Sequence, residues 1–171
     1  MNKYLRLTAL AATAATMALT SAPALAQVAP NQNATARARV LRPLTLTWVR
    51  NFDLGTIVLS GAAPFSATVS LSQAGALTCP ASVTCSGATS TARYNVRGTN
   101  NQVVLISAPN VTLSDGSGNN LLLSVSAPPS VTLTSSGAPG DDFDIGGSIT
   151  VSDTTVDGVY TGTFNVTAQY Q

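Results

Sequence analysis

The sequence predicts an all-β fold, an immunoglobulin-like β-sandwich, and three observations support this class. Short segments with alternating apolar and polar residues recur along the chain, separated by glycine, proline, asparagine or serine. Apolar residues do not recur at helical spacing in these segments. Only 9% of the residues are charged, and threonine and serine supply most polar positions. This combination is typical of strands that each turn one face toward a core.

The N-terminus has the composition of a cleaved signal peptide. Lys3 and Arg6 precede the apolar stretch 7–19, and Ala24-Leu25-Ala26 supplies the small residues needed for cleavage before Gln27. A membrane anchor is the alternative, but the stretch is shorter than the roughly 20 residues of a spanning helix. We therefore expect the chain to be exported.

Residues 1–26 are expected to be the signal peptide and residues 27–171 a single β-sandwich domain. A chain of this length buries about two-thirds of its unfolded surface, which suffices for a core without metals. No linker, internal repeat or later membrane-spanning stretch is found in the sequence. We expect the mature protein to pass through the periplasm to the cell surface or the extracellular space, with no membrane span.

Ten strands are expected in the mature chain, the first of them bent at Pro43, and turn-forming residues separate them. The strands are expected at residues 34–49, 54–59, 65–71, 92–97, 102–106, 111–113, 120–126, 130–134, 147–152 and 158–171. The clearest breaks are the segments 108–110 (APN), 115–116 (DG), 128–129 (PP) and 137–140 (GAPG). This spacing is that of a sandwich.

The last fourteen residues show the strongest alternation. Every second residue is glycine or apolar: Gly158, Tyr160, Gly162, Phe164, Val166, Ala168 and Tyr170. The intervening residues are mostly polar, so we expect one face of this strand to meet a core or groove and the other to meet water. Alternation alone would also fit the last strand of any closed sandwich.

Cys79 and Cys85 are the two cysteines of the chain. An exported protein leaves the reducing cytoplasm, so we expect them to form a disulfide. The short loop between them would add about 2 kcal/mol by the chain-entropy estimate. A redox or metal role is disfavoured, because the spacing is not C-x-x-C and the chain has no histidine to assist.

The amino-acid composition excludes most kinds of catalytic site and of zinc site. Removal of Lys3 and Arg6 from the eight basic residues leaves six arginines against seven aspartates, with no histidine, glutamate or lysine. The usual bases that activate a nucleophile and the usual zinc ligands are therefore missing. We expect no enzymatic activity and no cofactor. A nearly neutral chain without a dense basic run is also not expected to bind nucleic acid.

Two aspartate-rich segments are interpreted as polar turns. Asp141, Asp142 and Asp144 lie in one short stretch, and residues 115–119 (DGSGN) form the second. Three carboxylates in one turn could hold Ca²⁺, but neither spacing is that of an EF-hand loop. We expect no metal site, with calcium binding as the alternative.

The large aromatic residues are expected to lie in the core, because a sandwich of this size needs a few large side chains inside. They are Trp48, Phe52, Phe65, Phe143 and Phe164. A sugar-binding platform is the alternative, for which Trp48 is the candidate.

The terminal segment resembles the C-terminal motif of pilus subunits assembled by a periplasmic chaperone and an outer-membrane usher. Gly158, Phe164 and Tyr170 stand at matching positions. The resemblance implies an incomplete sandwich whose last strand borders an open groove. A chaperone strand fills the groove first, and the N-terminal extension of the next subunit then replaces it. The implied partners are the chaperone, the usher and further copies of the chain in a fibre.

Two more segments resemble an exported bacterial family catalogued as domain of unknown function 4402. Residues 34–58 have its alanine-rich first strand and apolar stretch, and residues 145–151 (IGGSITV) precede the terminal segment as in the family. Asp53-Leu54-Gly55 departs from the family turn, because no phenylalanine precedes the glycine. The family is similar to spore coat U-type subunits of archaic pili, which implies a fold completed by a donated strand.

The leading hypothesis is a structural or adhesive cell-surface protein, a pilus-type subunit assembled by strand exchange and active in adhesion or biofilm formation. The segment after the cleavage site offers a donor strand with mostly small side chains, at Val28, Ala34, Ala36, Ala38 and Val40. The alternative is a self-complete, monomeric secreted sandwich that binds a surface glycan or a protein.

Overall fold

A computed structural model describes residues 33–171 of the protein, and residues 39–171 form one compact unit. The predicted all-β class is confirmed, since no described residue lies in a helix and every sheet is antiparallel. Within residues 33–171, no helix has the length and hydropathy needed to cross a membrane. The predicted signal peptide 1–26 and Val28 of the predicted donor lie outside the described residues.

The described chain contains twelve strands. They are β1 (Thr45–Arg50), β2 (Thr56–Leu59), β3 (Ser66–Leu71), β4 (Leu77–Thr78), β5 (Val83–Ser86), β6 (Ala92–Arg97), β7 (Val103–Ser107), β8 (Val111–Ser114), β9 (Asn120–Ser126), β10 (Ser130–Thr132), β11 (Asp141–Ser152) and β12 (Thr167–Tyr170). Seven of them form a sheet in which β1, β6, β11, β3 and β4 follow one path and β9 joins β11 to β8. A second sheet has the order β10-β7-β12, and β2 pairs with β5.

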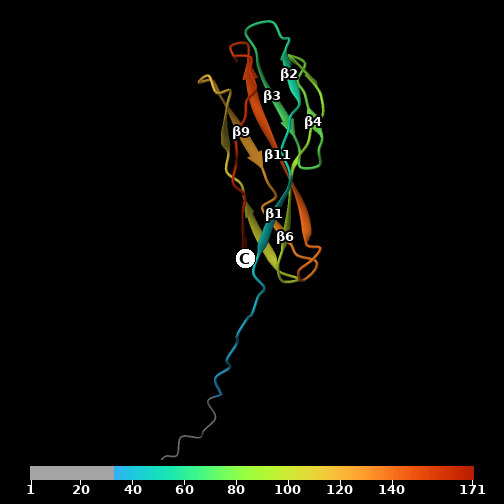
Figure 1. Cartoon of the computed structure of the whole chain (residues 1–171), viewed down its shortest axis with the longest axis vertical. Coiled ribbons are helices and arrows are strands. Elements are labelled where there is room, and N and C mark those ends of the chain that lie inside the picture. The colour runs from blue at the N-terminus through green and yellow to red at the C-terminus, as the bar shows by residue number, and fades with distance from the viewer. Residues whose placement is uncertain (1–32) are drawn as a thin grey trace, which may run out of the picture. The chain divides into compact units, whose positions relative to one another are not determined.

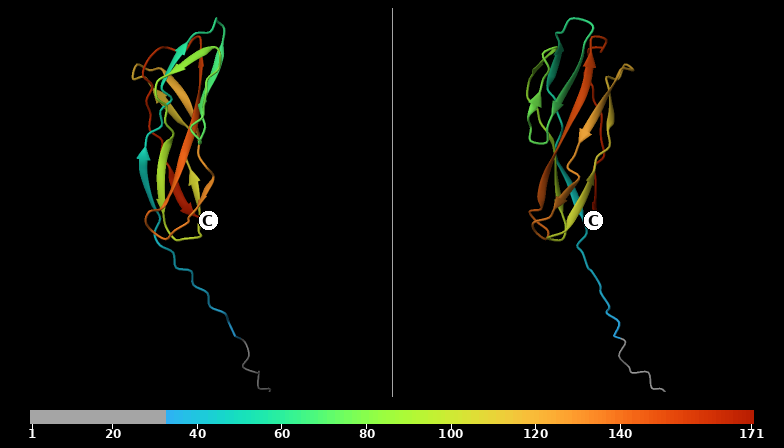
Figure 2. Two further views of the ribbon diagram at one scale, coloured as in Figure 1. Left: turned by 90° about the vertical axis from the view of Figure 1, so that its right-hand side faces the viewer. Right: turned by 180° about the vertical axis from the view of Figure 1, so that it is seen from behind.

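Strand β11 runs through both halves of the domain (Figure 1). Its first five residues pair with β6, whereas its second half pairs with β3 and with β9. The side view in Figure 2 shows β1 and β6 in one layer and β12 in the other. β11 is therefore paired with neighbouring strands along its whole length.

Two apolar clusters form the core, and β11 contributes to both. Ile149 and Val151 belong to the cluster built with β3 and β9, while Phe143 and Ile145 belong to the cluster built with β6 and β7. Phe164 and two other partly buried residues, Phe52 and Val125, pack against both clusters. The clusters thus form two halves of one continuous interior.

Most of the predicted strands are found, and two of them, 92–97 and 120–126, have the predicted bounds. The first prediction was too long, because residues 33–44 have no regular structure and β1 begins at Thr45. The short strands β4 and β5 were not predicted. Two and four residues are too few to show a period.

The segment from Asp141 to Asp144 is the first third of β11, and its interpretation as a polar turn was wrong. Phe143 and Ile145 point inward and are buried, whereas Asp142 is exposed on the alternate face. Two aspartates at alternate positions are a normal outer face of a strand. The PG and GG dipeptides on either side of the segment, at residues 139–140 and 146–147, suggested breaks, but the first lies before β11 begins and the second lies within the strand.

Gly146 and Gly147 mark the point where β11 changes partners. A Cβ atom at Gly146 would overlap the carbonyl oxygen of Leu71. At Gly147 a Cβ atom would lie 3.0 Å from Cδ1 of Leu123 and 3.1 Å from the carbonyl oxygen of Ser124. Only glycine lets the backbones of β3 and β9 approach β11 this closely.

We expect Gly146→Ala to lower the free energy of unfolding by about 1–3 kcal/mol, the usual cost of forcing an extra group into a packed interior. Ser148→Ala, two residues along the same strand, should change it by less than about 0.5 kcal/mol. Urea denaturation of both variants measures the difference. Equal unfolding free energies for the two variants would contradict the close approach at Gly146.

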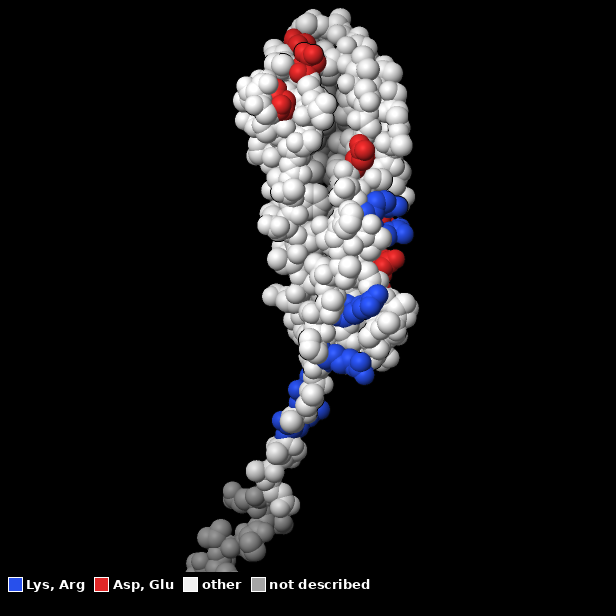
Figure 3. Space-filling model, viewed as in Figure 1, with Lys and Arg blue, Asp and Glu red and all other residues white. Residues whose placement is uncertain are grey.

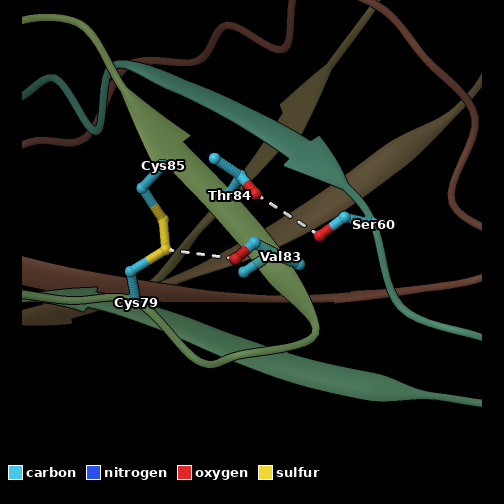
Figure 4. Close-up of a disulfide and its surroundings, with 5 residues drawn as sticks. All are labelled: Ser60, Cys79, Val83, Thr84 and Cys85. Atoms are coloured by element: carbon cyan, nitrogen blue, oxygen red, sulfur yellow. Dashed lines mark hydrogen bonds between the residues drawn. A yellow bond between two sulfur atoms is a disulfide. The ribbon is translucent and has the colours of Figure 1, made fainter.

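The structure joins Cys79 to Cys85, with their Cα atoms 6.1 Å apart (Figure 4). Cys79 directly follows β4, and Cys85 lies in β5, whose one described strand partner is β2. Sγ of Cys79 also lies 3.7 Å from the carbonyl oxygen of Val83 (Figure 4). The bond therefore ties the small β2–β5 sheet to the end of the main sheet.

Non-reduced mature protein should contain no free thiol on titration under denaturing conditions. The double variant Cys79→Ser/Cys85→Ser should be less stable by about 2 kcal/mol, because the unfolded chain regains the freedom of a short loop. Adding a reductant should lower the stability of the wild type and leave the variant unchanged. Two alkylated cysteines in native, non-reduced protein would refute the expected link.

Candidate assembly edge between the first and last strands

Strand β1 lies at the edge of the main sheet. It pairs with β6 and with no other described strand. Its register is regular from Thr45, opposite Arg97, to Trp48, opposite Tyr94, and a bulge then intervenes before Arg50. The backbone on the side away from β6 is therefore free to form hydrogen bonds.

Strand β12 lies at the edge of the second sheet, where it pairs with β7 alone among the described strands. Thr167 stands opposite Ser107, and Tyr170 stands opposite Val104. Its other side has no ladder partner in the part of the chain that the structure describes. β1 and β12 thus each present an unpaired edge, one in each layer, while β10 is the other edge strand of the second sheet.

The two unpaired edges lie on the same side of the domain. Tyr170 Oη donates a hydrogen bond to the carbonyl oxygen of Arg42, just before β1, at 2.7 Å, and accepts one from the N–H of Thr99 at 2.8 Å. Leu44 and Tyr170 also both approach Gly98. Figure 1 shows the C-terminal end beside the start of β1.

The inner face of β1 is poorly covered. Trp48 stands opposite Tyr94, which in turn stands opposite the buried Phe143. Directly opposed residues share a face, so Trp48 belongs to the inner face. Its side chain is nevertheless 57% exposed, and Leu46 on the same face is half-buried. The expectation that Trp48 lies in the core was therefore wrong.

The inner face of the last strand is also incompletely covered. Exposure alternates along the final residues, and those that pack against the core are only half-buried, in contrast to Val104 of the neighbouring β7, which is fully buried. We call the incompletely covered inner faces of the two edges the apolar edge strip. It consists of Leu44, Leu46, Trp48, Phe164, Val166, Ala168 and Tyr170.

The first part of the predicted terminal strand lies elsewhere. Gly158, Tyr160 and Gly162 precede β12 in a segment without regular pairing, apart from a bridge between Thr161 and Ser114 of β8. The Oη of Tyr160 donates to the carbonyl oxygen of Val156. The continuous strand over 158–171 was therefore wrong, because the chain leaves β8 before it reaches β7. The predicted inward face holds from Phe164 onward.

The aspartates predicted as a cluster have separate partners. Asp141 accepts hydrogen bonds from Thr134, and Asp142 accepts one from Asn95 Nδ2 at 2.6 Å. Asp144 is held by Arg93. No group of three possible metal-ligating side chains occurs among residues 33–171.

The second predicted turn, residues 115–119, does bend back on itself. Asp115 Oδ1 accepts the N–H groups of Ser117 and Asn119 at 2.8 and 3.0 Å, and Oδ2 accepts Nδ2 of Asn119 at 2.6 Å. The side-chain hydrogen bond from Asn119 is the main reason that the pKa of Asp115 lies below its usual value. These contacts engage both carboxylate oxygens within the turn.

Asp144 forms ion pairs with two arginines, Arg50 and Arg93. Arg93 donates to both of its oxygens, at 3.0 and 2.7 Å, and Thr91 Oγ1 donates to Oδ1 at 2.9 Å. The hydrogen bond from Arg93 is the largest cause of the lowered pKa of Asp144, against a smaller opposing effect of burial. The same contact raises the pKa of Arg93.

A lowered pKa in the folded state gives stability that is present above the unfolded pKa of about 3.9 and is lost as the pH falls through the folded value. Asp144→Asn should therefore cost about 1 kcal/mol at pH 7 and lose less stability than the wild type on acidification below pH 4. Asp153→Asn, at an exposed position, is the control variant, and its free energy of unfolding at pH 7 should stay within about 0.5 kcal/mol of the wild type. Denaturant unfolding from pH 7 down to pH 2 measures both; identical profiles for Asp144→Asn and wild type would contradict the assignment.

Comparison with known proteins gives one match. A family model described as Domain of unknown function (DUF4402) matches residues 44–170, from the start of β1 to the end of β12. No curated protein and no solved structure matches the chain. The matched region includes every residue of the apolar edge strip. Since the match covers most of the chain, as the resemblance of its motifs predicted, the protein belongs to the DUF4402 family.

Proposed function

We propose that the protein is an exported structural or adhesive subunit whose copies join into a fibre by strand addition at the apolar edge strip. The observation that carries the proposal is the pair of unpaired edges, one in each layer, with the 57% exposed Trp48 on the inner face between them. One added strand would satisfy backbone groups and cover apolar side chains at the same time. The similarity of the terminal segment to chaperone–usher subunits supports the same function.

The proposed donor is the segment that precedes β1 in another copy. Residues 33–40 are exposed and have no regular structure, and Val40 is 91% exposed. Seven residues, 34–40, would span about 23 Å as a strand, which matches the seven residues from Phe164 to Tyr170. The apolar residues at alternate positions of this segment, Ala34, Ala36, Ala38 and Val40, have small side chains, which suit a strip that already carries large ones, such as Trp48.

A chaperone and an usher are the proposed partners before assembly. An exposed strand edge with an apolar face tends to pair with any available strand, which leads to aggregation. A chaperone strand on the strip would prevent this until the next subunit arrives. The competing hypothesis is a closed, monomeric secreted domain that binds a surface glycan or a protein. The hydrogen bond from Tyr170 to the carbonyl oxygen of Arg42 favours it, because this bond links the two edges within one copy.

Trp48→Thr should abolish SDS-resistant, heat-dissociable multimers when the full chain is co-expressed with its chaperone and usher. The reason is that the change removes the largest uncovered side chain of the strip while β1 keeps its pairing with β6. Phe143→Leu is the matched control, because it weakens the core near Trp48 by about 1–1.5 kcal/mol without altering the strip. It should still form multimers.

Thermal unfolding of the two purified variants tests whether both are folded, so that a loss of multimers in Trp48→Thr is not mistaken for unfolding. Multimers that persist in Trp48→Thr would contradict strand addition at this edge. A wild type that remains monomeric with both partners present would instead support the closed monomer.

A further inference from the structure

A polar cavity of about 280 Å³ lies between the turn after β3 and the segment that leads into β6. Arg50 and Arg93 line it together with Asp144, and hydroxyl and amide groups complete the wall, including those of Thr89 and Gln73. Figure 3 shows arginine and aspartate atoms close together along the right-hand side of the domain, with further acidic atoms near its top. The cavity is therefore the place where charge is concentrated in this domain.

The bulge in β1 brings Arg50 to this place. Without it, Arg50 would share the inner face with Trp48, two residues earlier. The shift instead sets Arg50 opposite Arg93, which stands opposite Asp144. Arg93 adjoins the inward-facing Tyr94, so all three charged residues lie on the outer face. The cavity and the apolar edge strip thus occupy different faces.

The cavity carries two cations and one anion. Arg93 binds Asp144 with two hydrogen bonds, at 3.0 and 2.7 Å, whereas Nη2 of Arg50 lies at the longer distance of 3.2 Å from Oδ1. Oδ1 already accepts from Arg93 and Thr91. Both arginines therefore share one carboxylate, with the closer contacts from Arg93, and the three residues together keep one net positive charge.

Hydrogen bonds to Thr91 hold the Arg50 side chain in place and leave part of its guanidinium group exposed. Its Nε donates to the carbonyl oxygen of Thr91 at 2.9 Å, and its Nη2 donates to Thr91 Oγ1 at 2.6 Å. Within residues 33–171, Nη1 of Arg50 donates to no protein atom, and the side chain is 44% exposed. A fixed guanidinium with free donors suits a planar oxyanion.

We propose that this cavity binds the carboxylate of an acidic saccharide, a uronic acid residue of a polysaccharide, with Arg50 as the anion-binding residue. The hydroxyl and amide groups of the wall match the hydroxyl groups of a sugar, and no aromatic or large apolar surface is present for a lipid among its lining residues. The volume lies just below the roughly 300–1,000 Å³ of sites for drug-sized ligands. One sugar residue is therefore the unit recognised.

The test titrates the full mature chain with oligogalacturonate at low salt and with the methyl ester of the same oligosaccharide, which lacks the charge. We expect the acid to bind and the ester to bind at least about tenfold more weakly. Arg50→Gln should weaken binding of the acid at least about tenfold, while the Arg93–Asp144 pair keeps the sheet intact. Arg97→Gln is the matched control, since Arg97 lies on the same strand as Arg93 but contacts Asn95 and Pro139 outside the cavity.

Equal binding of the acid and the ester, equal affinities of the two arginine variants, or no binding of oligogalacturonate by the wild type would each overturn the proposal. Thermal unfolding of both variants confirms that the comparison is between folded proteins. The measurement is made on the monomer, so its outcome is independent of fibre assembly.

Discussion

The close approach of three backbones at Gly146 and Gly147 is the constraint on which the rest of the domain depends. It lets β11 change from β6 to β3 and β9 without a break in the strand, so that both apolar clusters are built on one backbone. A side chain there would push β3 and β9 away from β11 and loosen the packing of both clusters against the shared strand. The IGG sequence is therefore a packing requirement, and the family match over residues 44–170 extends across it.

Much of this architecture could be predicted from the sequence, because period-two alternation survives wherever one face of a strand is buried. Residues 92–97 and 120–126 show this, as does the inward face from Phe164 to Tyr170. The errors occur where tertiary contacts override local signals. The segment from Asp141 to Asp144 resembles a turn in isolation, but Asn95 and Arg93 of the neighbouring β6 bind Asp142 and Asp144, and no sequence pattern announces partners 47 and 51 residues away.

The candidate site, too, could be predicted only in part from the sequence. Alternation identified one side of the apolar edge strip, whereas its other side depends on which strands are neighbours in space. Leu44 and Leu46 alternate with polar residues as clearly as the terminal segment does, yet only the fold brings them beside Tyr170. The position of Arg50 could not be predicted either, because a bulge of one residue in β1 decides whether its side chain lies on the inner or the outer face of the sheet.

The half-buried state of β12 has a consequence for how the domain opens. A strand with one ladder partner and two half-buried side chains, Ala168 and Tyr170, is released at a lower free energy than β11, which has neighbours along its full length. The C-terminal strand should thus exchange its amide hydrogens before β11 does, through opening events that leave the two cores intact. This strand would detach and pair again with β7 many times during the life of one folded molecule. The folded domain would therefore exchange between a state with β12 paired and a state with β12 released.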